Sequence, residues 1–245
     1  MAETTKWWID VTREGGLGRF APGFQTTLRV RVIHAMLRKR VHVETAMLQD
    51  EVVDLIYALE PDAVLHGGTA IWRCYDGNRF SEDLDFYMLP QEGFEKRLEE
   101  KLVQRQLELT KFKQTQNAIY SKIFNGSVEV RFEALLKDPS AIAGVEARSF
   151  RRTDGSELDV LTLSPEAFVE EKLETYLSRR LVRDYYDIYH LLRYAQDTPA
   201  LKSAVRSFLS KAVQPLDAQN LSAIVYSGAV PSFEQMSRVI TVFSK

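Results

Sequence analysis

The sequence predicts an α+β protein, in which a mixed β-sheet core is flanked by helices and followed by a mostly helical C-terminal domain. Hydrophobic residues recur with helical spacing toward both ends of the chain, and polar and apolar residues alternate in the middle, as in strands. The 245 residues and 45% hydrophobic content are enough for at least one sizeable core. We expect a helical segment over 1–60 that packs on the core, an α/β core over 61–163 and a helical domain over 164–245.

The composition excludes several classes of protein. A formal net charge of -2 argues against a nucleic-acid coat with a global basic field, and leaves room for a local basic patch. Cys74 is the only cysteine, which excludes an intrachain disulfide framework and a multi-cysteine zinc site. The start of the chain lacks the basic and apolar regions of a secretory signal, and no window reaches about 18 apolar residues. We therefore expect a cytoplasmic protein without a membrane-inserted segment.

Helices are expected over 24–40 and 44–60 in the N-terminal segment. In the second helix, Met47, Val52 and Ile56 follow helical spacing, and Pro61 ends it. A cluster of cations near the first helix is either a local surface for RNA phosphates or a set of solvated positions: Arg29, Arg31, Arg38, Lys39 and Arg40.

The middle of the chain predicts strands over 62–66, 82–88, 118–124, 127–136 and 157–163, with an amphipathic helix over 93–106. Gly126, between Asn125 and Ser127, suits a hairpin turn between two of these strands. The elements do not repeat as regular βαβ units, so we expect a mixed sheet.

From Ser164 the pattern is helical again. Ser164 is a good N-cap, Pro165 suits the first helical position and Glu166 lies where the helix dipole favours an acid. An apolar stripe of helical period follows: Phe168, Val169, Leu173, Tyr176, Leu177 and Leu181. A second helix is expected over about 183–195, and two or three more beyond residue 197.

Two glycines stand between a predicted strand and a helix expected to begin near Ala70. In the segment Gly67, Gly68 and Thr69, glycine allows a ligand to approach the backbone closely, and the free N–H groups of a helix start favour a phosphate. A plain tight turn would give the same residues.

Two aspartates follow in the next strand. Side chains at i and i+2 of a strand share a face, so Asp83 and Asp85 point the same way about 6.7 Å apart, while Leu84 and Phe86 point into the core. This spacing suits two metal ions held about 3.5–4 Å apart, an arrangement used in phosphoryl transfer. The alternative is a solvated strand face with scattered charge.

Taken together, the glycines, Arg79, Ser81 and the Asp-Leu-Asp strand resemble the core motif of the nucleotidyltransferase superfamily. More narrowly, "GGTAI" followed by "RFSEDLDF" resembles the AbiEii/AbiGii toxins of type IV toxin–antitoxin systems. The resemblance implies that the nucleotide is bound by Gly67, Gly68, Thr69, Arg79 and Ser81. It further implies that Asp83 and Asp85 are catalytic and hold magnesium, with two ions expected.

Superfamily members often add a third carboxylate from a neighbouring strand. In "SVEVRFEALL", Glu129, Arg131 and Glu133 share one face. Glu129, between two valines, best fits the expected apolar-acid-apolar pattern and is the predicted third metal ligand. Glu133 is the alternative, and either glutamate could instead pair with Arg131.

A second dense cluster lies in the C-terminal half. Asp184 and Asp187 share one side of a helix and form i,i+4 pairs with Arg180 and Arg183, which is typical of a salt-bridged, solvated helix. Such pairs contribute only about 0.3–0.5 kcal/mol each.

The family resemblance implies more for this cluster. It implies that Lys172 contacts the triphosphate as a catalytic residue, and that Asp187 is a catalytic acid near the reaction centre, with general-base action as one possibility. Asp184 could equally hold Arg180. His66, next to the glycines, could touch phosphate but is more typical of a structural histidine.

The leading hypothesis is a Mg²⁺-dependent nucleotidyltransferase, the toxin of a type IV toxin–antitoxin (abortive infection) system. The resemblance implies transfer of a nucleoside monophosphate from an NTP to an acceptor, the tRNA 3′ end or another RNA, with pyrophosphate released and translation blocked. A cognate antitoxin would be a partner. The alternatives are a nucleotidyltransferase that modifies a small molecule or a protein side chain, and a non-catalytic module that binds a nucleotide or a partner.

Overall fold

The computed structural model describes residues 33–37 and 39–245. Most of the helix predicted over 24–40 lies outside the described residues, as do three members of the N-terminal basic cluster, Arg29, Arg31 and Arg38. Of the predicted first helix the structure describes α1, Ile33–Met36.

The helices and strands follow in an order that confirms the predicted change from helix to sheet to helix. Before the last strand they are α2 (Arg40–Leu59), β1 (Val64–His66), α3 (Gly67–Cys74), β2 (Leu84–Met88), α4 (Phe94–Gln104), β3 (Glu108–Gln114), β4 (Ala118–Phe124), β5 (Glu129–Leu136), the 3₁₀ turn η1 (Pro139–Ala141) and β6 (Val145–Arg151). From there they are β7 (Glu157–Leu163), α5 (Pro165–Arg179), α6 (Val182–Leu191), α7 (Pro199–Leu209), η2 (Ala218–Asn220), α8 (Leu221–Ile224) and α9 (Phe233–Phe243).

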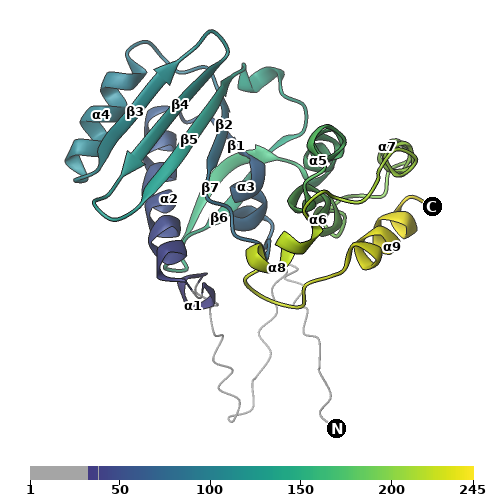
Figure 1. Ribbon diagram of the computed structural model, residues 1–245. Coiled ribbons are helices and arrows are strands. Elements are labelled where there is room, and N and C mark those ends of the chain that lie inside the picture. The colour runs from purple at the N-terminus through teal and green to yellow at the C-terminus, as the bar shows by residue number, and fades with distance from the viewer. Residues whose placement is uncertain (1–32, 38) are drawn as a thin grey trace, which may run out of the picture. The chain divides into compact units, whose positions relative to one another are not determined.

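The strands form one mixed sheet in the order β3-β4-β5-β2-β1-β7-β6 (Figure 1). Two pairs are parallel, β2 with β5 and β1 with β7, and the other neighbours are antiparallel. The α+β fold class is therefore confirmed. The central strand β2, which carries Asp85 and directly follows Asp83, is hydrogen-bonded on both sides, so its position is rigidly defined.

The predicted strands over 118–124 and 157–163 are β4 and β7 with the same bounds, and Gly126 (φ 90°) lies in the turn between β4 and β5. β3 and β6 were not predicted. They are the two edge strands of the sheet, and their side chains, mostly exposed in β3 and mostly half-buried in β6, give no regular apolar alternation. The helix after the glycines begins at Gly67 rather than near Ala70, so both glycines belong to its first turn.

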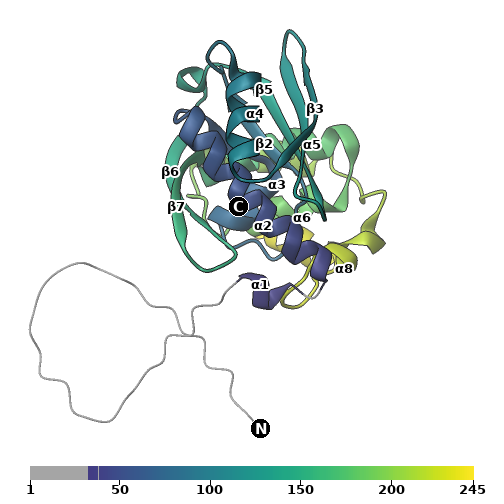
Figure 2. The same ribbon diagram turned by 90° about the vertical axis from the view of Figure 1, so that its left-hand side faces the viewer.

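Helices α2 and α4 cover one face of the sheet, as Figure 2 shows. That face buries Leu84 and Phe86 of β2 together with Val130 and Phe132 of β5. Burial of this apolar surface, at about 25 cal/mol per Å², is the main stabilising contribution to the core. The side chains at the alternate positions of the same strands point to the opposite face, where the candidate site lies.

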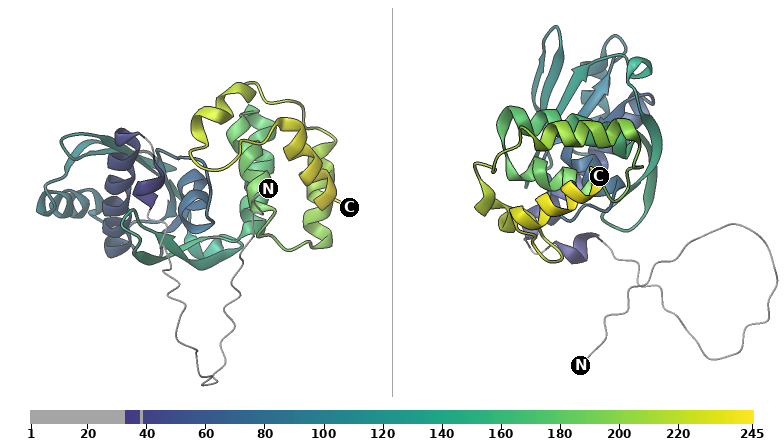
Figure 3. Two further views of the ribbon diagram at one scale, coloured as in Figure 1. Left: turned by 90° about the horizontal axis from the view of Figure 1, so that it is seen from below. Right: turned by 90° about the vertical axis from the view of Figure 1, so that its right-hand side faces the viewer.

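The C-terminal helices gather beyond β1, β7 and α3 (Figure 3). α5 begins as predicted, with the Ser164 hydroxyl accepting a hydrogen bond from the backbone N–H of Ala167 at 3.3 Å and with Pro165 at the first position. In the described chain, α7, α8 and α9 follow α6, as expected. The predicted boundaries near residues 60 and 163 fall in the α2–β1 and β7–α5 connections, and the division into domains stays a prediction.

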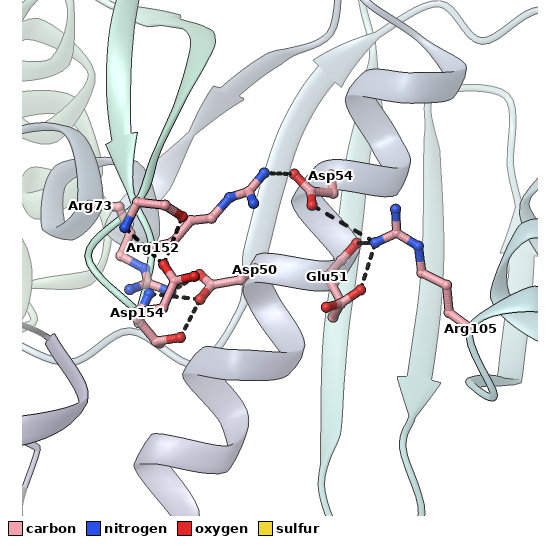
Figure 4. A network of polar contacts seen from close by, with 9 residues as sticks. Asp50, Glu51, Asp54, Arg73, Arg105, Arg152 and Asp154 are labelled. Carbon is pink, nitrogen blue, oxygen red and sulfur yellow. Dashed lines mark hydrogen bonds and ion pairs between the residues drawn. The ribbon is translucent and has the colours of Figure 1, made fainter.

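A buried ion pair fixes the middle of α2 to the rest of the core (Figure 4). Asp50 of α2 pairs with Arg73 of α3, and its other oxygen accepts hydrogen bonds from the backbone N–H and the hydroxyl of Thr153 at 2.8 and 2.6 Å. The side chain of Arg73 is 0% exposed and lies 4.4 Å from the centre of the Trp72 ring. The pair therefore joins α2, α3 and the β6–β7 turn.

We expect Asp50→Asn to destabilise the protein by about 3–5 kcal/mol, because it leaves the buried Arg73 charge without a counter-ion. Urea denaturation followed by circular dichroism measures this. The matched control is Glu51→Gln, which removes the exposed ion pair with Arg105 and should cost less than about 1 kcal/mol. Equal effects of the two substitutions would contradict the prediction.

Candidate active site

The start of α3 is packed directly against the second aspartate of β2. Gly67 has a φ of 71°, a left-handed conformation that favours glycine, and a Cβ at this position would overlap the Asp85 carboxylate. β1 and β2 are antiparallel neighbours, with His66 opposite Asp85. The strand pairing therefore brings the first glycine and the carboxylate into contact.

The second glycine accommodates the loop before β2. A Cβ on Gly68 would lie 2.6 Å from Arg79 Nη2 and 2.6 Å from Ser81 Oγ. The Thr69 hydroxyl, fully buried, donates to the backbone carbonyl of Asp83 at 2.6 Å, and the Gln49 amide donates to that of Ser81 at 2.9 Å. The structure thus brings together the predicted nucleotide-binding residues, and Thr69 positions Asp83 through its hydroxyl.

Asp83 directly precedes β2 and contacts Arg131 of β5, and the parallel pairing of β2 with β5 places Glu133 beside Asp85. Because Arg131 and Glu133 share a face of β5, the two aspartates lie on the same side, as predicted. Burial raises the pKa of Asp85, and the negative charge of Asp83 adds to this against the opposing effect of His66. Burial, then Asp85 and then Asp83 raise the pKa of Glu133. Negative charge therefore accumulates where the three carboxylates meet, and a bound cation would offset it.

Arg131 of β5 supplies positive charge to this group. Its Nε and Nη2 donate to the two carboxylate oxygens of Asp83 at 2.7 and 2.9 Å. The pairing of a glutamate with Arg131, considered from the sequence, is not what the structure shows. The arginine instead contacts a predicted metal ligand from the neighbouring strand.

Glu129, the predicted third ligand, is not brought to the aspartates. It lies four residues before Glu133 on β5, which at about 3.3 Å per residue is roughly 13 Å away along the strand. Its carboxylate accepts a hydrogen bond from Lys122 at 2.5 Å and another from the Thr110 hydroxyl at 3.0 Å. Of the two glutamates considered, Glu133 is therefore the one at the level of Asp85.

The donor set fits magnesium after one change of partner. Mg²⁺ prefers carboxylate oxygens, and Asp83, Asp85 and Glu133 supply these from adjacent positions. As the described residues stand, no three His, Cys, Asp or Glu side chains are close enough together to hold a metal ion. Both oxygens of Asp83 are bound by Arg131, so this carboxylate would have to exchange the arginine for a metal ion in order to coordinate one.

A second group of charges is buried behind the loop. Arg79, 5% exposed, donates from Nε and Nη2 to the two oxygens of Asp187 at 2.5 and 2.6 Å, and Asp187 is 0% exposed. Lys172 Nζ lies 3.3 Å from the same carboxylate and 3.7 Å from Asp184. Burial alone would raise the pKa of Asp187, but the charges of Arg79 and Lys172 outweigh it and hold the pKa below its usual value.

The solvated-helix alternative for this region is wrong, because Asp184 and Asp187 are both fully buried. The expected partners are wrong too. Asp184 accepts two hydrogen bonds from Arg179 at 2.7 and 2.8 Å, while Arg180 donates to the carbonyl of Gln214. Asp187 instead takes its partner from the distant and buried Arg79, because a buried carboxylate needs a nearby counter-charge. The partner of Asp184 is local, five residues before it in the sequence.

A cavity of about 390 Å³ opens beside Asp83. Its wall carries four cationic side chains from separate parts of the chain: Lys39, Arg79, Arg131 and Arg183. Ser81 lines it as well, and the rings of His42 and Phe80, also in the wall, stack with their centres 4.1 Å apart. A cavity with cations, an aromatic surface and an adjacent aspartate has the chemistry to bind a nucleoside triphosphate.

The sequence matches the family model described as the nucleotidyl transferase AbiEii toxin of type IV toxin–antitoxin systems, over residues 54–227. The chain belongs to this family. The matched region contains all of the predicted site residues, from Gly67 to Asp187. The AbiEii assignment makes the protein a nucleotidyltransferase. No curated protein matches the sequence.

Solved structures show the same fold at low sequence identity. The nucleotidyltransferase toxin MenT4 of Mycobacterium tuberculosis has a TM-score of 0.55 and 21% identity, with 82% of each chain covered. JHP933 of Helicobacter pylori has a TM-score of 0.54 and 20% identity, covering 82% of this chain and 90% of its own. A candidate nucleotidyltransferase of H. pylori has a TM-score of 0.58 and 18% identity, covering 84% of this chain and 94% of its own.

Glu171 and Gln49, beside the candidate site, were not predicted from the sequence, whereas His66 was considered there as a phosphate contact or a structural histidine. His66 stacks on Tyr87 with ring centres 3.7 Å apart, and Glu171 accepts a hydrogen bond from the Tyr87 hydroxyl at 2.9 Å and lies 3.6 Å from His66. His66 therefore has packing partners next to Asp85. Gln49 supports Ser81 from α2, and no local sequence pattern indicates this role.

Among the described helices, none is long and apolar enough to span a membrane.

We expect Gly68→Ala to lower nucleotidyl transfer by about a hundredfold, because the added Cβ displaces Arg79 and Ser81 by about 1 Å. Incorporation of labelled nucleotide measures this. Gly93→Ala is the control, since φ there is 72° but no atom lies within 4 Å of the added Cβ. That substitution should cost about 1–2 kcal/mol of stability and leave transfer unchanged. Normal transfer by the Gly68 variant would refute the steric argument.

We expect Asp187→Asn to destabilise the protein by about 3–5 kcal/mol at neutral pH, because Arg79 and Lys172 lose their buried counter-charge. The pKa of Asp187 is lowered in the folded state, so its contribution is fully present above the unfolded value of about 3.9 and declines as the pH falls through the folded value. Urea denaturation of both proteins over a pH series tests this. A stability difference that does not shrink below about pH 4 would contradict it.

Proposed function

We propose that the protein transfers a nucleoside monophosphate from an NTP to an RNA acceptor, the tRNA 3′ end, in a Mg²⁺-dependent reaction that releases pyrophosphate. The observation that supports this most directly is the meeting of two sets of residues at one cavity. Asp83 and Arg131 line it on the sheet side, and Arg79 and Arg183 line it on the side of the C-terminal helices. Membership of the AbiEii family indicates the class of reaction, nucleotidyl transfer, and the cavity supports the proposed location of the active site.

We place the triphosphate of the NTP in this cavity. Ser81 offers a hydroxyl there, and Lys39, Arg131 and Arg183 offer positive charge. The first turn of α3, with Gly67 and Gly68, adds backbone N–H groups behind Ser81 and Asp85. The half-buried His42 ring, supported from behind by the buried Phe80 on which it stacks, offers a flat surface on which the base can rest.

We assign magnesium to Asp83 and Asp85 with Glu133 as the third ligand, and two ions in keeping with the spacing of the aspartates. Bound Mg²⁺ would neutralise negative charge that develops on the phosphate oxygens. In the absence of metal, Arg131 offsets the charge of Asp83 by donating to both of its carboxylate oxygens, while Thr69 holds the backbone carbonyl of the same residue.

In this proposal Asp187 positions Arg79 and Lys172 and takes no part in proton transfer. Its lowered pKa makes it a weak base, which argues against the general-base role considered from the sequence. Held by Arg79 and Lys172, it keeps both cations beside the loop of Ser81. Lys172 then contributes a fixed positive charge that favours departure of pyrophosphate.

The biological role we propose is that of a cytoplasmic toxin. Addition of a nucleotide to the tRNA 3′ end would prevent aminoacylation and so block translation. The type IV toxin–antitoxin family implies a cognate antitoxin that counteracts the activity.

Incubation with Mg²⁺, each α-labelled NTP and a mixture of total RNA and protein tests the proposal. We expect label in tRNA-sized RNA, reduced at least about a hundredfold by Asp83→Asn or Asp85→Asn. Asp159→Asn, on an exposed position of β7, is the matched control and should leave labelling unchanged. EDTA should abolish the labelling.

Other outcomes would overturn parts of the proposal. Label found only in protein or in a metabolite would exclude RNA as the acceptor while leaving nucleotidyl transfer intact. Binding of NTP without any transfer, under all these conditions, would exclude catalysis and favour a binding module.

A further inference from the structure

One face of the strands β3, β4 and β5 is not covered by a described helix, and it extends from the aspartates to the edge of the sheet. Of the described helices, α2 and α4 pack on the opposite face of β3, β4 and β5, and Figure 1 shows these three strands without a helix in front of them. On β3 and β4 the exposed side chains of this face are polar or aromatic. We use the name open platform for Lys111 and Lys113 of β3 with Tyr120 and Lys122 of β4.

The strand register connects the open platform to the candidate active site in two rows. One row runs across the sheet from Asp85 through Glu133 and Tyr120 to Lys113. In the parallel row, Asp83 contacts Arg131, which lies opposite Lys122, and Lys122 lies opposite Lys111. Directly paired residues share a face, so both rows are on the open side. Three strand spacings make each row about 14 Å long.

The charge along these rows changes sign away from the aspartates. The carboxylates are concentrated at β2 and β5, where the metal is proposed, and the cations lie toward the edge strand. Lys122 is engaged by Glu129, whereas Lys111 and Lys113 are exposed and form no ion pair with any residue that the structure describes. Tyr120 lies between Glu133 and Lys113 and is 40% exposed.

We propose that the open platform binds the 3′ segment of the acceptor RNA in single-stranded form and leads its terminal hydroxyl to Asp83 and Asp85. This inference rests on the proposed function for the identity of the reaction. Unpaired lysines match backbone phosphates, and an exposed tyrosine offers a surface on which an unpaired base stacks.

The chemistry of the open platform favours single-stranded RNA over other acceptors. Base stacking on Tyr120 needs a base that is not already stacked in a duplex. A protein acceptor with an apolar contact surface finds little to bury against three lysines, since lysine is depleted in protein interfaces. The platform also lies outside the 390 Å³ cavity, so RNA and NTP bind without competing for the same residues.

RNA binding by the full chain, measured without NTP, tests this inference separately from catalysis. The probe is a fluorescein-labelled single-stranded RNA with a free 3′ end, followed by anisotropy over a range of salt concentrations. We expect the double variant Lys111→Glu and Lys113→Glu to weaken binding at least about tenfold and to reduce the salt slope by about 2. A duplex of the same sequence should compete poorly with the single strand.

The matched control is the double variant Lys96→Glu and Lys101→Glu on α4, which makes the same charge change on the covered side of the sheet. It should bind RNA with the wild-type affinity and salt slope. Equal weakening by both double variants would show a non-specific charge effect and overturn the inference. RNA binding that survives in the platform variant, with normal labelling of RNA, would do the same and leave the proposed function intact.

Tyr120 provides a test that leaves the charge unchanged. Tyr120→Ala should weaken binding of the single strand about tenfold, and Tyr120→Phe should retain the wild-type affinity because the stacking surface is kept. Equal binding by the alanine and phenylalanine variants would remove the stacking contact from the proposal. If instead the platform variants bind RNA normally and lose labelling of a protein, the platform binds a protein acceptor and the inference is wrong.

Discussion

The candidate site depends on the buried pair between Arg79 and Asp187, which joins the loop before β2 to the helix α6. The two residues are 108 positions apart in the sequence, and both are shielded from water. In a low-dielectric interior such a pair holds its geometry strongly, since loss of either partner leaves an uncompensated charge. Lys172 shares the same carboxylate, so the sheet and the C-terminal helices present their charges to one cavity in a fixed relation.

The carboxylates near β2 and the buried charges around Asp187 have different roles. The carboxylates of Asp83, Asp85 and Glu133 are partly accessible, and burial together with the charges of neighbouring aspartates raises the pKa of Asp85 and of Glu133, which suits the reversible binding of a cation. The positive charges of Arg79 and Lys172 compensate the negative charge of Asp187, which suits a rigid framework that does not change when substrates bind or leave. Gly67 and Gly68 lie between the two groups. A Cβ on Gly67 would collide with Asp85, and one on Gly68 would collide with Arg79 and Ser81.

The sequence was enough to predict the residues that are close together along the chain. Gly67, Gly68, Asp83 and Asp85 form one strand–helix–strand unit, so local patterns place them correctly. Glu129 and Glu133 have the same parity on β5, and only the pairing with β2 distinguishes them, which alternation does not encode. Likewise, the i,i+4 rule offered Arg183 to Asp187, whereas the actual partner comes from a distant loop and is chosen by burial.

Two neighbouring residues of α2 serve different parts of the molecule. Gln49 holds the carbonyl of Ser81 at the candidate site, and Asp50 holds Arg73 and Thr153 in the core. A rotation of the helix would break both contacts at once, so the two are mechanically coupled although they touch no common group. Any local opening of α2 would therefore release the loop of Ser81 together with Arg73 and Thr153.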